Sequence, residues 1–284
     1  MPAGRTAILA IPVAVRYIPA VAVDFKWDPR FRGEGMSLGL CRGLTAWVDG
    51  ENVTQEGMGL GAAACRHRRL TYFSANAIAH QGEDGVVRAR YRLDRRIMWR
   101  MGEWQSPWLT RLVESTADGY MSVPKLQLPL MVAATMIRRK LRLNSRFVPA
   151  SPVAETQFAY TVRGREVDID CTVRLLGRGS TKVSIMSELG ADFFTGAIAK
   201  GRMLAPPTGW QPLALDFPTP ALYDRRHELK FSLASVIVTP AAPWRLYWGR
   251  EKTADCCWAG FEIEVDVRRL PAETLSVRYV VSLG

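Results

Sequence analysis

Apolar and polar residues alternate with a period of two along several segments of the chain. Segment 86–94 reads VVRARYRLD, and segments 165–176 and 261–267 read REVDIDCTVRLL and FEIEVDV. Successive side chains of a β-strand point to opposite faces of the sheet, so this period is typical of strands that bury one face. Turn signals such as VDGEN (48–52) and QGEDG (81–85) separate the segments. The pattern predicts an all-β, mostly antiparallel protein, built as a large β-sandwich or barrel-like body.

Helical patterns are few. Segment 106–116, SPWLTRLVEST, has a serine at the N-cap position and a proline in the first turn, and it predicts a short helix. Segment 191–200, which Gly201 would close, predicts a second one. Segment 128–144 fits either a helix with a basic C-terminal end or a buried strand that continues into an exposed one, and both interpretations stay open.

A six-residue phrase occurs twice, as EGMSLG at 34–39 and as EGMGLG at 56–61. We expect each copy to begin a strand in which Met and Leu point to one side while the glycines leave the other side bare. Glycine inside a strand marks a bulge, a bend or a close approach of another backbone. The phrase therefore predicts a place where a covering segment, or alternatively a ligand, lies directly against the sheet.

The charge of the chain is uneven. The 284 residues include 38 basic and 27 acidic ones, and 22 of the basic residues but only 12 of the acidic ones precede residue 151. A proline-containing stretch at 145–155 coincides with this change. We expect a basic β-rich half at 1–150 and a near-neutral β-rich half at 151–284, packed together as one body. The positive excess favours an anionic partner, although 31 of the basic residues are arginines, which codon usage in a GC-rich genome would also produce.

Several classes of protein are disfavoured by the sequence. The five cysteines show neither a CxxC nor a Cys/His spacing, so we expect no metal site, and their odd number favours a reducing cytoplasm over a secreted disulfide framework. No segment reaches the roughly 18 uninterrupted apolar residues of a membrane span. The apolar N-terminal run is interrupted by Arg16 and two prolines, and predicts a first strand rather than a signal peptide. No phosphate-binding or dinucleotide fingerprint is present, so we expect no cofactor. Whether the protein forms a homo-oligomer stays open.

No strong catalytic signature is present, and whether the protein is an enzyme stays open. Polar residues nevertheless occur among aromatic ones in MSELGADFF, PPTGW, LYDRRHE, RLYWGRE and CCWAGFE. A carboxyl beside tryptophans can have a raised pKa and act as an acid or base, and a neighbouring arginine can hold an anionic group. The candidate catalytic residues are Glu188, Tyr223, His227, Arg250 and Glu251, and the candidate stacking residues are Trp210, Trp248 and Trp258. Mutual ion pairing and core packing are the competing interpretations.

Three arginines, Arg88, Arg90 and Arg92, share one face of the segment 86–94. Side chains on one face of a strand recur about every 7 Å, which is close to the spacing of phosphates or uronate carboxylates along a polymer. We predict that they bind an anionic ligand. Alternatively, the protein's own acids neutralise them, and Asp168 and Asp170 are the candidates.

Three functions are compatible with these features. The first is a β-sandwich that binds an acidic carbohydrate, and in one version cleaves or modifies it as a lyase or hydrolase, through arginine, tryptophan and carboxylate side chains. The second is a nucleic-acid-binding protein that uses the basic strand face. The third is a lipocalin-like barrel that binds or converts an apolar small molecule between the glycine-bearing strands. The tryptophan and carboxylate content favours the first.

Overall fold

The computed structural model describes residues 21–27, 43–54, 58–68, 70–83, 85–100, 143–148, 153–213, 219–253 and 256–284, together with the single positions 133, 136 and 140. Most of these residues belong to strands, and the strands pair antiparallel. The predicted all-β, mostly antiparallel fold is therefore confirmed. Within these ranges, no helix has the length and hydrophobicity that crossing a membrane needs.

The strands form a small and a large sheet. The small sheet contains β1 (Val23–Lys26), β2 (Thr45–Val48) and β3 (Glu51–Asn52). The other fifteen strands form the large sheet: β4 (Leu60–His67), β5 (Leu70–Glu83), β6 (Val86–Arg100), β7 (Leu143–Val148), β8 (Ala154–Arg163), β9 (Glu166–Leu175), β10 (Ser180–Gly190), β11 (Phe194–Ala199), β12 (Arg202–Leu204), β13 (Gly209–Leu213), β14 (Ala221–Asp224), β15 (Leu229–Thr239), β16 (Trp244–Thr253), β17 (Cys256–Asp266) and β18 (Thr274–Leu283).

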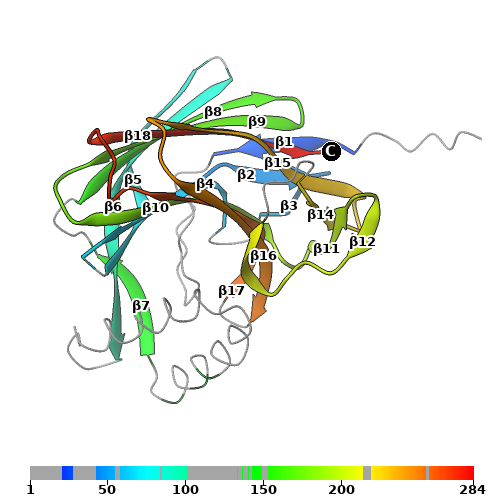
Figure 1. The fold of residues 1–284 in the computed structure, drawn as a ribbon. Helices are drawn as coiled ribbons and strands as arrows, with labels where there is room; N and C mark the ends of the chain where they lie inside the picture. Colours follow the sequence, from blue (N-terminus) through cyan, green and yellow to red (C-terminus); the bar gives the residue numbers. More distant parts are fainter. Residues whose placement is uncertain are drawn as a thin grey trace, which may run out of the picture.

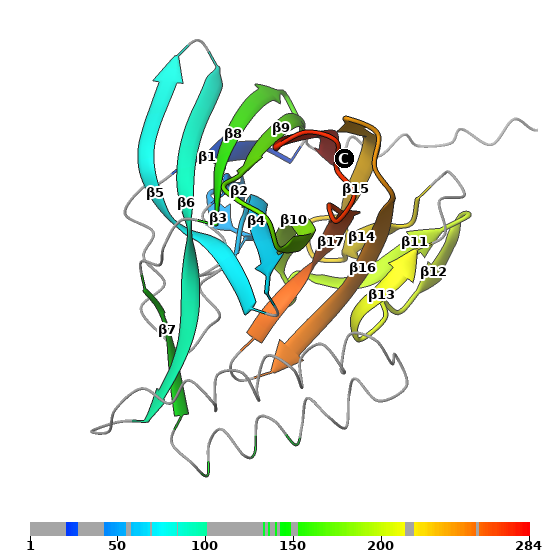
Figure 2. The same ribbon diagram turned by 60° about the vertical axis from the view of Figure 1, so that its left-hand side comes forward.

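The large sheet follows one path, in the order β12-β11-β14-β15-β18-β9-β8-β6-β5-β4-β10-β17-β16-β13, with β7 paired to β6 beside it. The path folds over, so that β8, β9, β18 and β15 lie in one layer and β4, β10, β17 and β16 in the other (Figure 1, Figure 2). The end strands β12 and β13 are consecutive in the sequence, with only residues 205–208 between them. The chain therefore joins the two ends of the sheet directly. The strands β6, β5 and β4, which precede residue 150, form one block within the path, and strands that follow residue 150 flank this block on both sides.

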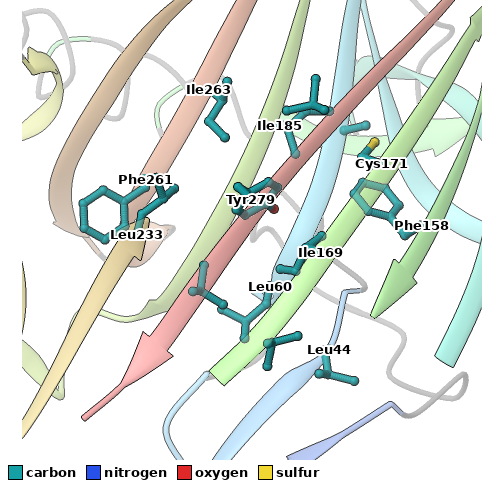
Figure 3. Packing of buried hydrophobic residues seen from close by; sticks show 14 of the residues in the cluster. Leu44, Leu60, Phe158, Ile169, Cys171, Ile185, Leu233, Phe261, Ile263 and Tyr279 are labelled. Atoms are coloured by element: carbon teal, nitrogen blue, oxygen red, sulfur yellow. The ribbon is translucent and has the colours of Figure 1, made fainter. Parts of the chain in front are cut away.

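One large apolar core lies between the two layers (Figure 3). Buried hydroxyl groups connect the layers through it. The Tyr160 hydroxyl on β8 donates a hydrogen bond to the Gly61 carbonyl on β4 at 2.9 Å, and the hydroxyls of Ser187 on β10 and Tyr279 on β18 are 2.9 Å apart. Because the hydroxyls of Tyr160, Ser187 and Tyr279 all have a partner, these bonds join the layers without the cost of an unsatisfied hydroxyl.

The period-two interpretation is confirmed at the residue level. On β6, Ala89 and Tyr91 are buried while Arg88 and Arg90 are exposed, and β9 alternates throughout its length. On β17 the apolar residues of FEIEVDV are buried as expected. The same strand also contains one departure, because Glu262 on its polar face is buried too. The pattern thus identified the strands but not the environment of every polar residue.

The second copy of the repeated phrase begins β4, and its glycines permit close packing. Gly61 has a φ of +81°, and a Cβ atom added to it would lie 2.8 Å from Cε1 of Tyr160. A Cβ on Gly59 would lie 2.8 Å from the backbone nitrogen of Gly43. Positive φ and contacts this short both favour glycine. The first copy, at 34–39, lies outside the described residues.

One predicted helix is wrong. Residues 191–193 form a turn, Phe194–Ala199 is strand β11, and Lys200 and Gly201 make the turn into β12. The alanine- and glycine-containing segment pairs with β14 on one side and β12 on the other, and this pairing outweighs the weak helical preference of the segment. The predicted helix at 106–116 lies outside the described residues. In segment 128–144, positions 133, 136 and 140 are helical, and β7 begins at Leu143.

Candidate functional site

The register of four neighbouring strands places the candidate residues in rows on the outer face of the layer, away from the core. Glu188 on β10 lies opposite Gly260 on β17, which lies opposite Gly249 on β16, which lies opposite Trp210 on β13. In this row two glycines separate a carboxyl from an indole. Because glycine has no side chain, the two large groups at the ends of the row are not screened by intervening side chains.

The adjacent rows add a second carboxyl and two more aromatic rings. One row contains Met186, Glu262, Tyr247 and Pro212, and the row on the other side contains Gly190, Trp258 and Glu251. We call the outer surface formed by these strands the glutamate face. It consists of Met186, Glu188, Trp210, Tyr247, Glu251, Trp258 and Glu262.

Two carboxyls of the glutamate face are buried. Glu188 and Glu262 are only 3% and 6% exposed, although both lie on the face directed away from the core. Since Glu188 is opposite Gly260 and Glu262 is opposite Met186, the two glutamates are diagonal neighbours on adjacent antiparallel strands. Residues in this relation have Cα atoms about 7–8 Å apart. The side chains of both can therefore contact one ligand.

The environment of Glu262 favours its protonated form. Burial raises the pKa of this carboxyl from 4.5 to about 7, and a hydrogen bond with Ser184 offsets part of the effect. The nearby Glu264 raises the pKa further, while Lys182 lowers it. Lys182 is 2.8 Å from Oε2 of Glu264 and forms an ion pair with that residue. Near pH 7, Glu262 can therefore exist in both protonation states, as an acid–base catalyst requires.

Gly260 makes the arrangement of the glutamates possible. A Cβ atom on Gly260 would lie 2.3 Å from the Ser187 carbonyl oxygen and 3.2 Å from Cγ of Glu188. The Glu188 side chain thus lies directly over the backbone of Gly260. Any larger residue there would meet backbone atoms of β10, which cannot move without disturbing the pairing of the two strands.

Aromatic and apolar side chains surround the glutamates. The rings of Trp210 and Trp258 are stacked, with centroids 3.9 Å apart and an angle of 18° between their planes. Met58 packs against Trp258, and Met186 forms an apolar cluster with Ala62 and Ala64. Trp258 is only 4% exposed, so the half-buried Trp210 presents the accessible part of the pair. An indole face is an apolar surface of the kind that packs against sugar rings.

The structure brings four of the candidate residues together and directs two others inward. Glu188, Trp210, Glu251 and Trp258 all belong to the glutamate face. Trp248 points into the core and is 9% exposed. Arg250 donates hydrogen bonds from Nε and Nη2 to the Ala191 carbonyl oxygen at 3.0 and 2.8 Å. Its guanidinium thus holds the turn that follows the strand of Glu188.

Tyr223 and His227 lie at a different place, near the turn between β14 and β15. His227 donates from Nδ1 to Oδ2 of the fully buried Asp224 at 2.6 Å, and its Nε2 is 3.5 Å from Oε2 of Glu51. Tyr223 precedes Asp224 on β14 and therefore points to the opposite face of that strand, where it packs beside Gly196. The two candidates consequently do not form one acid–base pair.

The three arginines of segment 86–94 lie on β6, which is between β8 and β5 in the large sheet. Arg88 and Arg90 are exposed, and Arg92 is half-buried opposite Glu155. The acids proposed to neutralise them have other partners. Asp168 binds the guanidinium of Arg278, which lowers the pKa of that carboxyl, and Asp170 accepts a hydrogen bond from Ser276 at 3.3 Å. Across the part of the chain that the structure describes, neither Arg88 nor Arg90 is ion-paired.

Glu262 is the functional candidate that the sequence did not select. Its segment alternates so regularly that Glu262 resembles any solvent-exposed strand carboxyl. The signal that identifies it is the register of β10 and β17, because pairing Glu188 with Gly260 makes Glu262 a diagonal neighbour of Glu188. No set of three or more His, Cys, Asp or Glu side chains is placed to hold a metal ion among the residues that the structure covers.

Comparisons with known proteins do not assign a function to the glutamate face. No family model matches the chain, and no curated protein matches it. The solved structure of HI1317 aligns with a TM-score of 0.34 and 9% identity over 73% of this chain and 64% of HI1317, so the match spans less than two thirds of that protein. Slr1438 from Synechocystis sp. PCC 6803 aligns with a TM-score of 0.33 and 11% identity over 84% of this chain and 88% of Slr1438. Neither name states an activity.

Proposed function

We propose that this chain binds a carbohydrate on the glutamate face and acts on it by proton transfer, with Glu262 as the acid and Glu188 as its partner carboxylate. The observation that supports the proposal is the burial of two carboxyls on adjacent strands, one of which has a pKa raised to about 7. Desolvation raises the free energy of an ionised carboxyl, and carboxyls whose pKa is shifted in this way are frequent at functional sites. A perturbed carboxyl beside a second one is the arrangement that acid–base chemistry needs.

Cleavage of a glycosidic bond is the reaction that this pair fits best. Glu262 would donate its proton to the departing oxygen, and Glu188 would either activate a water molecule or attack the sugar carbon. Enzymes of this kind hold their two carboxyls between about 5 and 9.5 Å apart. Diagonal neighbours in an antiparallel sheet, with Cα atoms about 7–8 Å apart, can meet this requirement by small rotations of their side chains.

The surroundings of the pair limit the sugar that we propose. The half-buried Trp210, which stacks on the buried Trp258, offers the exposed part of its indole to the face of a pyranose ring. An anionic substituent beside Glu188 and Glu262 would be repelled by them. We therefore propose that the ring against the pair is uncharged, and that any acidic groups of the same saccharide lie outside the glutamate face.

The test compares three variants on a panel of neutral and acidic polysaccharides. E188Q and E262Q each remove one carboxyl with little change in shape, and we expect each to lower the rate of reducing-end release at least about 100-fold, because general acid–base groups contribute 10²–10⁴-fold. E264Q is the matched control, since Glu264 follows two residues later on the same strand and is ion-paired with Lys182. Saccharide binding, followed by tryptophan fluorescence, should persist in all three. Activity of E188Q and E262Q equal to that of E264Q would remove the glutamate face from consideration.

A second function, nucleic-acid binding, is favoured by one observation. Arg88 and Arg90 point outward from β6 without an acid partner among the described residues. If they bind phosphates, the logarithm of the affinity for single-stranded RNA should fall with the logarithm of salt concentration, and the R88A/R90A variant should reduce that slope by about 1.4, or 0.7 per contact. The control is R278A, which removes an arginine already paired with Asp168. Equal slopes for the two variants would exclude this surface.

A further inference from the structure

A cavity lies away from the glutamate face, where the turns β10–β11 and β14–β15 approach strand β3. Its volume is about 330 Å³, at the lower end of the range for small-molecule sites. The lining residues are Glu51, Asp192, Phe193, Thr195, Asp224, Arg225 and Arg226. The proton-transfer mechanism proposed above uses none of these residues.

The carboxylates of the cavity already have cationic or hydrogen-bonding partners within the protein. Asp224 accepts hydrogen bonds from the backbone nitrogen of Arg226 at 2.9 Å and from His227 at 2.6 Å. Glu51 accepts a hydrogen bond from Nη1 of Arg226 at 2.9 Å, and Asp192 forms an ion pair with Lys252. Two of the three carboxylates, Glu51 and Asp192, are thus ion-paired with a cationic side chain, and the buried Asp224 is held by a backbone amide and His227.

Arg225 is different from its neighbours. Arg225 lines the cavity, and its side chain makes no hydrogen bond or ion pair with the parts of the chain that the structure places. Thr195 supplies a hydroxyl, and the ring of Phe193, tilted against His227 with centroids 6.1 Å apart, supplies an apolar wall. A planar guanidinium with five donors binds a carboxylate or phosphate through two parallel hydrogen bonds.

We propose that this cavity is a second ligand site, which binds a small molecule through one carboxylate or phosphate group held by Arg225 and Thr195. Arg225 would supply the charge, Thr195 one further hydrogen bond, and Phe193 a surface for the apolar part of the ligand. The inference is independent of the proposed function, because the site shares no side chain with the glutamate face.

The experiment titrates the full chain with inorganic phosphate and, separately, with benzoate, by calorimetry at low salt. We expect millimolar or tighter binding of at least one anion, and a loss of about tenfold or more in R225A, since a hydrogen bond to a charged group has that effect. Tighter binding of benzoate would identify a carboxylate ligand that uses Phe193, and tighter binding of phosphate would identify a phosphorylated one. T195V should weaken binding to a smaller extent.

The control is R269A, which removes an exposed arginine beside another cavity, lined by Pro243, Asp266, Arg268 and Arg269. Binding should be unchanged in R269A and also in E188Q, so that failure of this proposal and failure of the proposed function can be distinguished. The proposal is overturned if neither anion binds at millimolar concentration, or if R225A and R269A weaken binding equally. Because Arg225 is exposed, R225A should keep the wild-type unfolding midpoint, which shows that any loss is local.

Discussion

The E262Q variant is expected to lose the pH dependence of stability that Glu262 gives the wild-type protein, and to gain stability relative to it at pH 8. In the folded state the pKa of Glu262 is about 7, whereas 4.5 is its ordinary value. The native protein therefore holds a proton that the unfolded chain releases between these two values. Stability from this group is fully present below pH 4.5, falls as pH rises, and is lost above pH 7.

The shift corresponds to about 3 kcal/mol, because each pKa unit is worth about 1.4 kcal/mol. Glutamine cannot ionise, so the difference in free energy of unfolding between E262Q and the wild type should increase by about this amount between pH 4.5 and pH 8. Urea titrations at several pH values measure it. E264Q does not serve as the control here, because Glu264 itself raises the pKa of Glu262. E166Q, which removes an exposed carboxyl on β9, takes its place and should follow the wild type. Parallel curves for E262Q and the wild type would show that the pKa of Glu262 is not raised in the folded protein.

The second large effect is expected from Gly260→Ala. The new methyl group would lie 2.3 Å from the Ser187 carbonyl oxygen, a backbone atom of the paired strand. The strands must separate locally to relieve this contact, and overpacking of this kind costs about 3 kcal/mol of unfolding free energy. The displacement should also reduce any activity of the glutamate face, since Glu188 lies against Gly260.

The matched control is Gly82→Ala on β5, where an added Cβ atom would meet nothing within 4 Å. We expect its unfolding free energy to change by less than about 1 kcal/mol. Adding E188A to G260A should not restore stability, because the shortest contact is with the backbone of Ser187 rather than with the Glu188 side chain. Equal stability of the two glycine variants would contradict the close approach of β10 and β17.

A buried acid that destabilises the protein at neutral pH is informative about function. Replacing Glu262 with glutamine is expected to stabilise the chain at pH 8 and to abolish the proposed chemistry. Residues that reduce stability commonly lie at functional sites, where activity depends on the property that causes the strain or desolvation. For E262Q we therefore expect a higher free energy of unfolding at pH 8 together with a lower activity.

Period-two alternation was sufficient to predict the strands and their buried faces, because the solvent exposure of a side chain on a two-sided sheet depends on the parity of its position. Glu188, Trp210, Glu251 and Trp258 were selected on a different ground, because each lies in a segment where polar and aromatic residues occur together. Sequence reasoning also assigned a helix to 191–200, because local propensity carries no information on the partner strands β12 and β14 that this segment pairs with.

The amino-acid sequence by itself determined the all-β class, the faces of β6, β9 and β17, and the residue types available for chemistry. Only the tertiary structure decided which of these residues meet. Glu188 and Glu262 are 74 positions apart and become neighbours through the register of β10 and β17, whereas the adjacent residues Tyr223 and Asp224 point to opposite sides of β14. The physical reason is that alternation specifies the side to which a residue points, while hydrogen-bonded pairing between distant strands specifies its neighbours and its burial.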